Sequence, residues 1–279
     1  MHYNFNSLSV SKLNTFISCP QKFYLHYILK VPDEFTPDFF KIGRCLHKIL
    51  ECINLDIQKG ILLHESSYAD LIEEKIKEYK VGNNFILTFP LYVAEYLSKI
   101  RPLILDSNSF VIGVEKEFKI PLKFKEKEYT FRGVIDLVVF NSDGSQIFDF
   151  KTKARNQEDT ELMLTRDLQV QMYSYLVHTY GKILRGQTPE LTFEGEGVPV
   201  SRYGHIQFTF KDNQVYFKYN KIFHYSEILD RVGYWVEKIE DCIKTGYFPR
   251  NPSFCSYCEK KSVCLGKTAI NKEKKYLDN

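Results

Sequence analysis

The chain has 279 residues, of which 44% are hydrophobic and 26% are charged, and its formal net charge is +3. This composition excludes a disordered chain, and the length allows one large domain or slightly more. No apolar run approaches the roughly 20 residues that span a bilayer. The first residues also lack the basic and apolar regions of a secretory signal, so we expect a cytoplasmic protein without a membrane partner.

The first hundred residues predict helices, because apolar residues recur at helical spacing. A short helix would be capped by Ser9 or Ser11, and Pro20 would open the next one. Further helices are expected over residues 38–54, 67–80 and 91–106.

The pattern then changes to strands at 111–121, 128–140 and 146–151. After them we expect a helix over 160–180, a loop over 184–202, a hairpin over 204–219 and a helix over 226–244. This order predicts an α/β fold with a mixed sheet flanked by helices. The expected domains are a helical N-terminal arm (1–110), a core (111–245) and a cysteine-rich C-terminal segment with a basic tail (246–279).

Charged residues on the predicted strands indicate a metal site. Asp149 and Lys151 lie two apart, so both side chains share one face while Phe148 and Phe150 point to the other. A plain ion pair is the commoner explanation of such a pair. However, Asp136 ends an apolar strand, where an unpaired charge would be costly. Two converging aspartates repel each other unless a cation lies between them, and their oxygens suit Mg²⁺ or Mn²⁺.

Such a centre would hydrolyse phosphodiesters, because a divalent ion lowers the pKa of bound water and neutralises transition-state charge. Lys151 would orient or deprotonate the water, or stabilise the developing charge. Gln169 and Tyr173 lie four apart on one helix face, where they would contact the catalytic groups or form an ordinary polar rim. His47 would be a third metal ligand or, as is commoner for a lone histidine, a core residue.

Four of the seven cysteines predict a second metal site. In a reducing compartment, cysteines serve metal binding or packing rather than disulfides. Cys255, Cys258 and Cys264 are spaced C-x2-C-x5-C, and Cys19 lies far upstream. Four thiolates would hold Zn²⁺ or a 4Fe–4S cluster, and their spacing alone does not choose between them. By analogy with a disulfide, closing so long a loop would contribute on the order of 4–5 kcal/mol.

Taken together, these motifs resemble the RecB-type branch of the PD-(D/E)XK nucleases. The resemblance is to its iron–sulfur members, namely the AddB nuclease domain and the four-cysteine exonucleases of CRISPR adaptation. It runs from Ser9 to Cys264. The matching motifs are Ser9-x-Ser-x-Leu-x5-Cys19-Pro-x2-Phe, Gly43-x3-His47-x2-Leu-Glu51, Gly133-x-Ile-Asp136, Asp149-Phe-Lys151, Gln169-x3-Tyr173 and Cys255-x2-Cys258-x5-Cys264.

The resemblance implies a restriction-endonuclease-like fold, with a metal cluster joining the N-terminal arm to the C-terminus. It implies metal ligation by His47, Asp136 and Asp149, with Lys151 as the catalytic lysine. It also implies a 4Fe–4S cluster on the four cysteines, which are Cys19, Cys255, Cys258 and Cys264.

Our first functional hypothesis is therefore a Mg²⁺- or Mn²⁺-dependent DNA exonuclease acting on single strands or DNA ends. Its pathway would be recombination and repair, CRISPR adaptation or phage DNA metabolism, and Phe16, Tyr24 or Tyr27 would stack on bases. The alternative is a non-catalytic DNA-end-binding subunit of a helicase–nuclease or integrase complex. A third possibility is a zinc-stabilised interaction protein. The chain has no phosphate-binding loop G-x4-G-K-S/T, so unwinding would need a partner such as a helicase.

Overall fold

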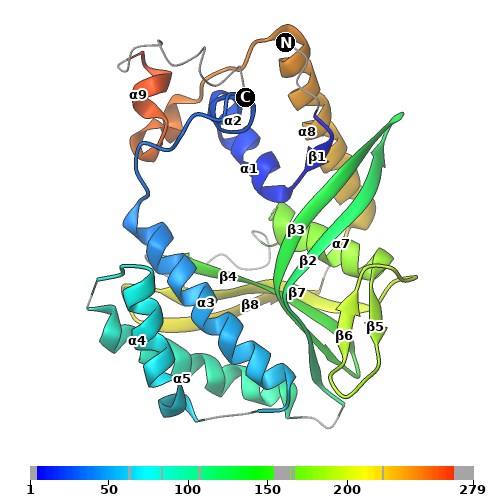
Figure 1. Ribbon diagram of the computed structural model, residues 1–279. Coiled ribbons are helices and arrows are strands. Elements are labelled where there is room, and N and C mark those ends of the chain that lie inside the picture. The colour runs from blue at the N-terminus through cyan, green and yellow to red at the C-terminus, as the bar shows by residue number, and fades with distance from the viewer. Residues whose placement is uncertain are drawn as a thin grey trace. The chain divides into compact units, whose positions relative to one another are not determined.

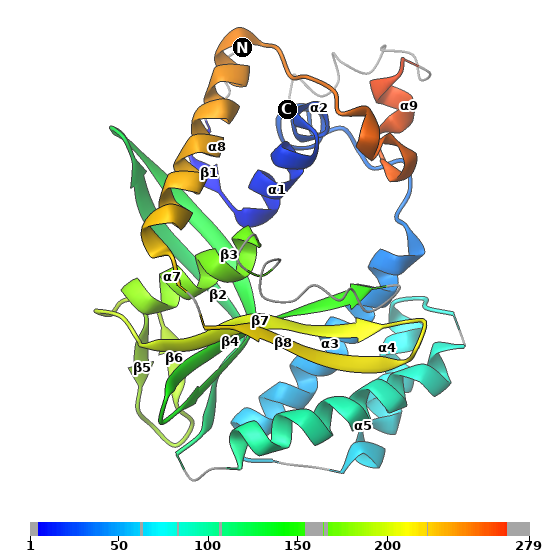
Figure 2. The same ribbon diagram turned by 180° about the vertical axis from the view of Figure 1, so that it is seen from behind.

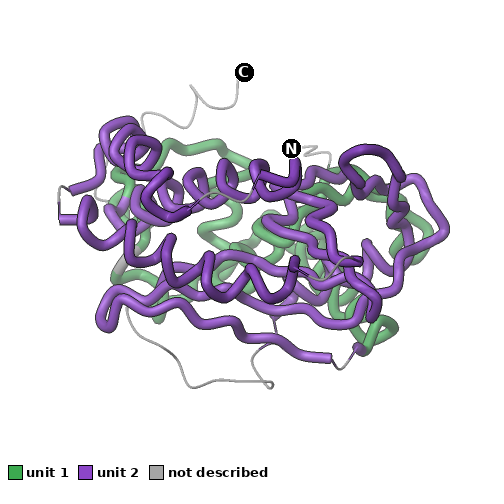
Figure 3. The backbone as a smooth tube through the Cα atoms, turned by 90° about the horizontal axis from the view of Figure 1, so that it is seen from below, with its two compact units in different colours: residues 1–36, 119–133, 224–279 green, residues 37–118, 134–223 purple. Residues whose placement is uncertain are grey.

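Figures 1 and 2 show the computed structural model of the protein from opposite sides. It describes residues 5–61, 64–82, 84–105, 108–153, 164, 167–221 and 223–266. Two units divide the chain (Figure 3). Unit 1 comprises residues 1–36, 119–133 and 224–279, and unit 2 comprises residues 37–118 and 134–223.

In unit 1, helix α1 (Val10–Ser18) begins after Ser9, whose hydroxyl accepts a hydrogen bond from the backbone of Lys12 at 3.2 Å. Of the two predicted caps, Ser9 is therefore the one used. Helix α2 (Pro20–Phe23) follows and continues as the π-helical turn η1 (Tyr24–Ile28). A short strand that the sequence did not predict, β1 (Ser7–Leu8), pairs in parallel with β3 (Lys127–Asn141).

The C-terminal part of unit 1 is the long helix α8 (Tyr225–Thr245), the turn η3 (Pro252–Tyr257) and the short helix α9 (Lys261–Cys264). Helix α8 ends at Gly246, whose φ of +70° is the left-handed conformation that glycine adopts at little cost. The predicted basic tail, residues 267–279, lies outside the described residues.

The aromatic side chains expected to stack on bases serve the packing of unit 1 instead. Phe16 is 3% exposed and meets the ring of Phe23 edge-on at 5.4 Å. Tyr24 stacks on Phe248 at 4.7 Å, and Tyr27 packs against Phe23 at 5.2 Å. The expectation is wrong for Phe16, since a buried ring offers no face to a base.

In unit 2, three helices carry an apolar face: α3 (Asp38–Gln58), α4 (Ala69–Glu78) and α5 (Phe85–Ile104). The short 3-10 turn η2 (Glu65–Tyr68) leads into α4. Helix α5 begins earlier than predicted and includes Pro90, because packing of the fully buried Phe89 outweighs the helix-breaking tendency of proline. Among the described helices, none is long and apolar enough to cross a membrane.

The sheet of unit 2 is mixed, as predicted. Strand β3 pairs antiparallel with β4 (Gly144–Lys153), β4 pairs parallel with β7 (Val200–Thr209), and β7 pairs antiparallel with β8 (Gln214–Asn220). Strand β2 (Phe110–Phe124) pairs with β3. Helices α3 to α5 lie on one side of this sheet and α7 (Leu168–Tyr180) on the other (Figures 1 and 2). These layers confirm the predicted α/β class.

Two predictions around α7 need comment. Residues 160–163 and 165–166 of the helix predicted over 160–180 lie outside the described residues. The loop predicted over 184–202 is wrong in part, because a small hairpin of β5 (Lys182–Leu184) and β6 (Glu190–Thr192) forms within it and β7 already begins at Val200. Strands of three residues are too short for their alternation to stand out in the sequence.

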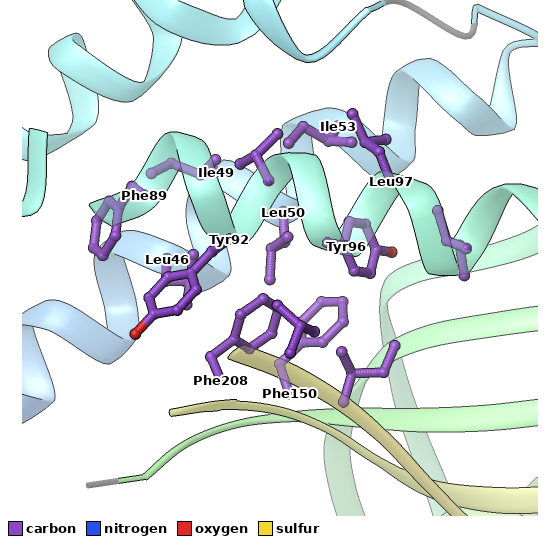
Figure 4. Close-up of a cluster of buried hydrophobic side chains, with 14 of the residues drawn as sticks. Leu46, Ile49, Leu50, Ile53, Phe89, Tyr92, Tyr96, Leu97, Phe150 and Phe208 are labelled. Atoms are coloured by element: carbon purple, nitrogen blue, oxygen red, sulfur yellow. The ribbon is translucent and has the colours of Figure 1, made fainter. Parts of the chain in front are cut away.

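The main core of unit 2 lies between α3, α5 and the sheet (Figure 4). Leu46 and Leu50 of α3 and Tyr96 of α5 pack over Phe150 and Phe208 of the sheet, and all five are almost fully buried. This face of β4 is the one that Phe148 and Phe150 were predicted to occupy. The opposite face of β4 therefore remains for Asp149 and Lys151.

One polar pair is buried inside this core, and it generates a stability prediction. The hydroxyl of Tyr96 donates to Oδ1 of Asn54 at 2.6 Å, and the Asn54 amide donates to the Leu50 carbonyl at 2.8 Å. Replacement Tyr96→Phe leaves a buried acceptor unpaired and should lower the free energy of unfolding by about 1–3 kcal/mol, measured by urea denaturation. The half-exposed Tyr219 provides the control, since Tyr219→Phe should be nearly neutral. Equal stability of the Tyr96→Phe variant and the wild type would contradict the assignment.

Candidate metal centre

The centre forms where β3 and β4 part. Their pairing ends at Leu137 opposite Phe148, and the same register would put Asp136 opposite Asp149. Beyond that point the backbone of Phe150 has no strand partner on the β3 side. Its amide instead donates to Oδ2 of Asp136 at 2.6 Å, and its carbonyl lies 3.1 Å from Nε2 of His47. Buried peptide groups must be paired, and here the pairing fixes two functional side chains.

The bond to Phe150 also sets the state of His47. A carbonyl only accepts, so Nε2 carries the proton and Nδ1 is left with its lone pair, 3.8 Å from Oδ2 of Asp136. Burial lowers the pKa of His47, although the carboxylate of Asp149 opposes that shift. A neutral imidazole that donates its other N–H to a backbone carbonyl is the usual state of a metal-ligating histidine.

Glu115 of β2 completes this group, and the sequence analysis missed it. Ligand atoms of His47, Glu115 and Asp136 lie within 4.8 Å of one another. Glu115 has a φ of +44°, which is strained for a residue other than glycine and is often found at functional sites. The available signal was modest: it is the first acidic residue after the apolar run Val111–Val114.

The carboxylates of the centre repel one another. Burial raises the pKa of Asp136 well above its ordinary value, and the charges of Asp149 and Glu115 add to the rise. Burial likewise raises the pKa of Glu115 to about 7, with a further contribution from Glu51. This concentration of buried acids would be relieved by a cation. The oxygen and imidazole donors fit Mg²⁺ or Mn²⁺.

Asp149 and Lys151 form an ion pair beside this group, on the face of β4 that the sequence predicted. Nζ of Lys151 lies 2.5 Å from Oδ2 of Asp149. Gln169 joins both, since its amide donates to Oδ1 of Asp149 at 2.6 Å and its carbonyl oxygen accepts from Lys151 at 3.0 Å. The Gln169 amide also lies 3.2 Å from the hydroxyl of Tyr173. The structure thus brings these four predicted residues together.

The protonation of this network follows from its surroundings. Burial acts to lower the pKa of Lys151, but the carboxylates of Asp149 and Asp167 outweigh it and raise the pKa. Burial raises the pKa of Tyr173, and the charge of Asp149 adds to that rise. Lys151 is therefore a cation and Tyr173 a neutral hydroxyl at physiological pH.

Asp167 holds the helix that carries Gln169, and sequence reasoning did not identify it. It is the N-cap of α7, where its carboxylate accepts from the amides of Gln169 at 2.8 Å and Val170 at 3.3 Å. Burial opposes its ionisation, but a contact with His205 at 3.1 Å and the charge of Lys151 lower its pKa to about 2. An ionised cap fixes the start of the helix, and hence the position of Gln169.

These side chains open into one cavity of about 550 Å³. His47, Glu115, Asp136, Asp149 and Lys151 all line it. A cavity of this volume, with a few converging polar groups and shifted pKa values, has the features of an active site.

The four cysteines of the second predicted site line a separate cavity in unit 1. Burial raises the pKa of Cys264, and the other three cysteines add to that rise while Arg250 opposes it. The backbone amide of Asn251 donates to the sulfur of Cys19 at 3.4 Å. The fold therefore brings Cys19 next to the C-terminal cysteines, which are Cys255, Cys258 and Cys264.

Comparison with known proteins places this geometry in context. The family model described as the PD-(D/E)XK nuclease superfamily matches residues 7–265. An ATP-dependent helicase/deoxyribonuclease subunit of Carboxydothermus hydrogenoformans is 27% identical over 217 residues, which are 65% of this chain. That alignment spans 19% of the relative's length. The crystal structure of SSO0001 covers 96% of this chain and 90% of its own, with 17% identity and a TM-score of 0.42.

The repelling carboxylates predict an unusual dependence of stability on pH. The folded-state pKa of Glu115 is about 7, against an ordinary value of 4.5, so between these values the folded protein retains a proton that the unfolded chain loses. Metal-free protein should therefore lose stability as pH rises from about 4.5 to about 7, by up to about 1 kcal/mol because Glu115 is partly exposed and screened. The raised pKa of Asp136 acts in the same direction.

Urea denaturation in EDTA at several pH values measures this slope. The Glu115→Gln variant should flatten it, and Mn²⁺ should flatten it in the wild type by taking the place of the proton. The matched control is Glu126→Gln, since the Glu126 side chain is 99% exposed. If the Glu115→Gln variant kept the wild-type slope, the buried-carboxylate account would be wrong.

Proposed function

We propose that this chain, which belongs to the PD-(D/E)XK nuclease superfamily, is a metal-dependent nuclease that hydrolyses phosphodiester bonds in DNA. The observation that carries the proposal is one cavity in which three converging metal-ligand side chains face a charged lysine. His47, Glu115 and Asp136 would hold Mg²⁺ or Mn²⁺, with Asp149 as a further carboxylate beside them. A bound divalent ion supplies an activated water and neutralises phosphate charge.

The residues of the chain divide the remaining work. Nδ1 of His47 offers a lone pair because Nε2 is occupied by the Phe150 carbonyl. Lys151 is held as a cation by Asp149, which suits it to stabilise the negative charge that develops on the phosphate and to orient the attacking water. Gln169 fixes the positions of Asp149 and Lys151, and Tyr173 in turn contacts Gln169.

We propose single-stranded DNA or DNA ends as the substrate and exonucleolytic cleavage as the reaction. The support is the name of the relative, a helicase/deoxyribonuclease subunit, together with a cavity that receives a single phosphate-bearing strand more easily than a duplex. We further propose a role in recombination or repair with a helicase partner. The rival hypothesis, a DNA-end-binding subunit without catalysis, predicts binding without cleavage.

Removal of Lys151 tests the catalytic assignment. The Lys151→Ala variant should cleave end-labelled single-stranded DNA roughly 100-fold or more slowly in Mn²⁺, because the cation that stabilises the transition state is lost. Lys77→Ala is the matched control, since Lys77 is an exposed lysine of α4 and its loss should change nothing. Equal cleavage by the Lys151→Ala variant would reject the role of Lys151, and absence of cleavage by the wild type would favour the end-binding hypothesis.

For the cysteine cavity we propose a 4Fe–4S cluster. Within the described part of the chain, no three cysteine sulfurs lie within 4.8 Å of one another. Tetrahedral zinc, with Zn–S bonds of about 2.3 Å, would hold sulfurs about 3.8 Å apart, so a larger group suits this spacing better. Lys22, Arg250 and Lys261 line the same cavity and offset the negative charge of the thiolates. The Asn251 amide bonded to Cys19 is a contact that such clusters use.

Metal analysis of protein purified without oxygen tests this second proposal. The wild type should contain iron and show the broad visible absorption of thiolate-bound clusters, and Cys255→Ser should lose most of both. Cys242→Ser is the matched control, because Cys242 lies on α8 and does not line the cavity. Stoichiometric zinc in place of iron would overturn the cluster and favour a zinc site.

A further inference from the structure

Two exposed phenylalanines stand at the edge of the candidate active-site cavity. Phe39 and Phe40 begin helix α3, and they are 49% and 48% exposed. Their ring centroids lie 4.4 Å apart with an interplanar angle of 35°. Both line the same cavity as His47 and Lys151. Large aromatic rings are seldom left in water without a function, and the core of unit 2 does not include this pair.

Helix α3 fixes the pair relative to the metal-ligand group. Phe39, Gly43 and His47 are spaced by four residues and so share one face of the helix. Eight residues of helix place Phe39 about 12 Å from His47 along the axis, a distance that a short run of extended nucleotides covers. Gly43 lets this face approach β4 closely, since a Cβ atom there would lie 3.2 Å from the hydroxyl oxygen of Thr152.

The charges beside the pair suit a polyanion. Arg44 is exposed on the next turn of the helix, and Lys153 lies two residues beyond Lys151 on the same strand. Arg44 and Lys153 both line the cavity, and among the described residues neither lies within 4 Å of a carboxylate. An aromatic surface with neighbouring cations is the arrangement that binds single-stranded nucleic acid by stacking bases and contacting phosphates.

We propose that Phe39 and Phe40 form a base-stacking platform for single-stranded DNA, which holds the nucleotides adjoining the phosphate at the metal centre. This inference rests on the proposed nuclease function and adds the way in which the substrate strand is held. A duplex keeps its base faces covered by stacking, so the platform selects strands whose bases are free. It therefore favours single strands and frayed ends over intact duplex.

Fluorescence anisotropy tests the platform with a labelled single-stranded oligonucleotide, in Ca²⁺ without Mg²⁺ or Mn²⁺. The Phe39→Ala/Phe40→Ala variant should bind roughly 5- to 100-fold more weakly, as expected for loss of one stacked base. The Phe39→Tyr/Phe40→Tyr variant should bind like the wild type, because the ring faces remain. Leu87→Ala, which removes an exposed side chain of α5 outside the cavity, should have no effect.

A series of oligonucleotides, each with one abasic nucleotide, makes the test specific. The wild type should lose affinity at one or two adjacent abasic positions, and the alanine variant should show no further loss at those positions. An alanine variant that binds like the wild type, or that keeps the same abasic sensitivity, overturns the platform. Cleavage by the wild type in Mn²⁺ is measured in parallel, so that loss of the platform alone is distinguished from failure of the proposed nuclease function.

Discussion

The candidate active site depends on the point at which β3 and β4 separate. A continuous ladder would have paired the amide and carbonyl of Phe150 with β3. Because the strands part after Leu137, these two groups are left to hold the side chains of Asp136 and His47. The phenyl ring of Phe150 is buried in the core on the other face. One residue thus connects the packing of unit 2 to the position of two expected metal ligands, and displacement of its backbone would disturb both.

The separation has an electrostatic cost that the rest of the site is arranged to carry. Asp136, Asp149 and Glu115 approach one another in a partly buried place, and burial with mutual repulsion raises the pKa of Asp136 and Glu115. Lys151 compensates only Asp149, which it contacts directly. The remaining negative charge lies on the side of His47, where the imidazole is neutral. The site is therefore unbalanced in the way that a bound divalent cation corrects.

Much of this arrangement was predictable from sequence because local rules decide it. Alternation on β4 places Asp149 and Lys151 on one face, and helical spacing places Gln169 and Tyr173 on another element facing them. Glu115 was not predictable in this way. Its strand has no motif, and its left-handed backbone conformation breaks the alternation from which a strand residue's direction is inferred. Tertiary contacts, which a single sequence does not express, bring it to the centre.

The two proposed sites use opposite ligand chemistry, and each lies within its own unit of the fold. Carboxylates and imidazole in unit 2 suit a hard cation, whereas thiols in unit 1 suit zinc or iron. The cysteine cavity is also joined by bonds that need no metal: Gln21 donates to the Pro249 carbonyl at 3.1 Å and Glu34 to the Glu259 carbonyl at 3.0 Å. These backbone bonds already bring the N-terminal segment beside the C-terminal one. A cluster on the cysteines would therefore reinforce a junction that the chain forms itself, and the hydrolytic chemistry proposed for unit 2 requires none of its atoms.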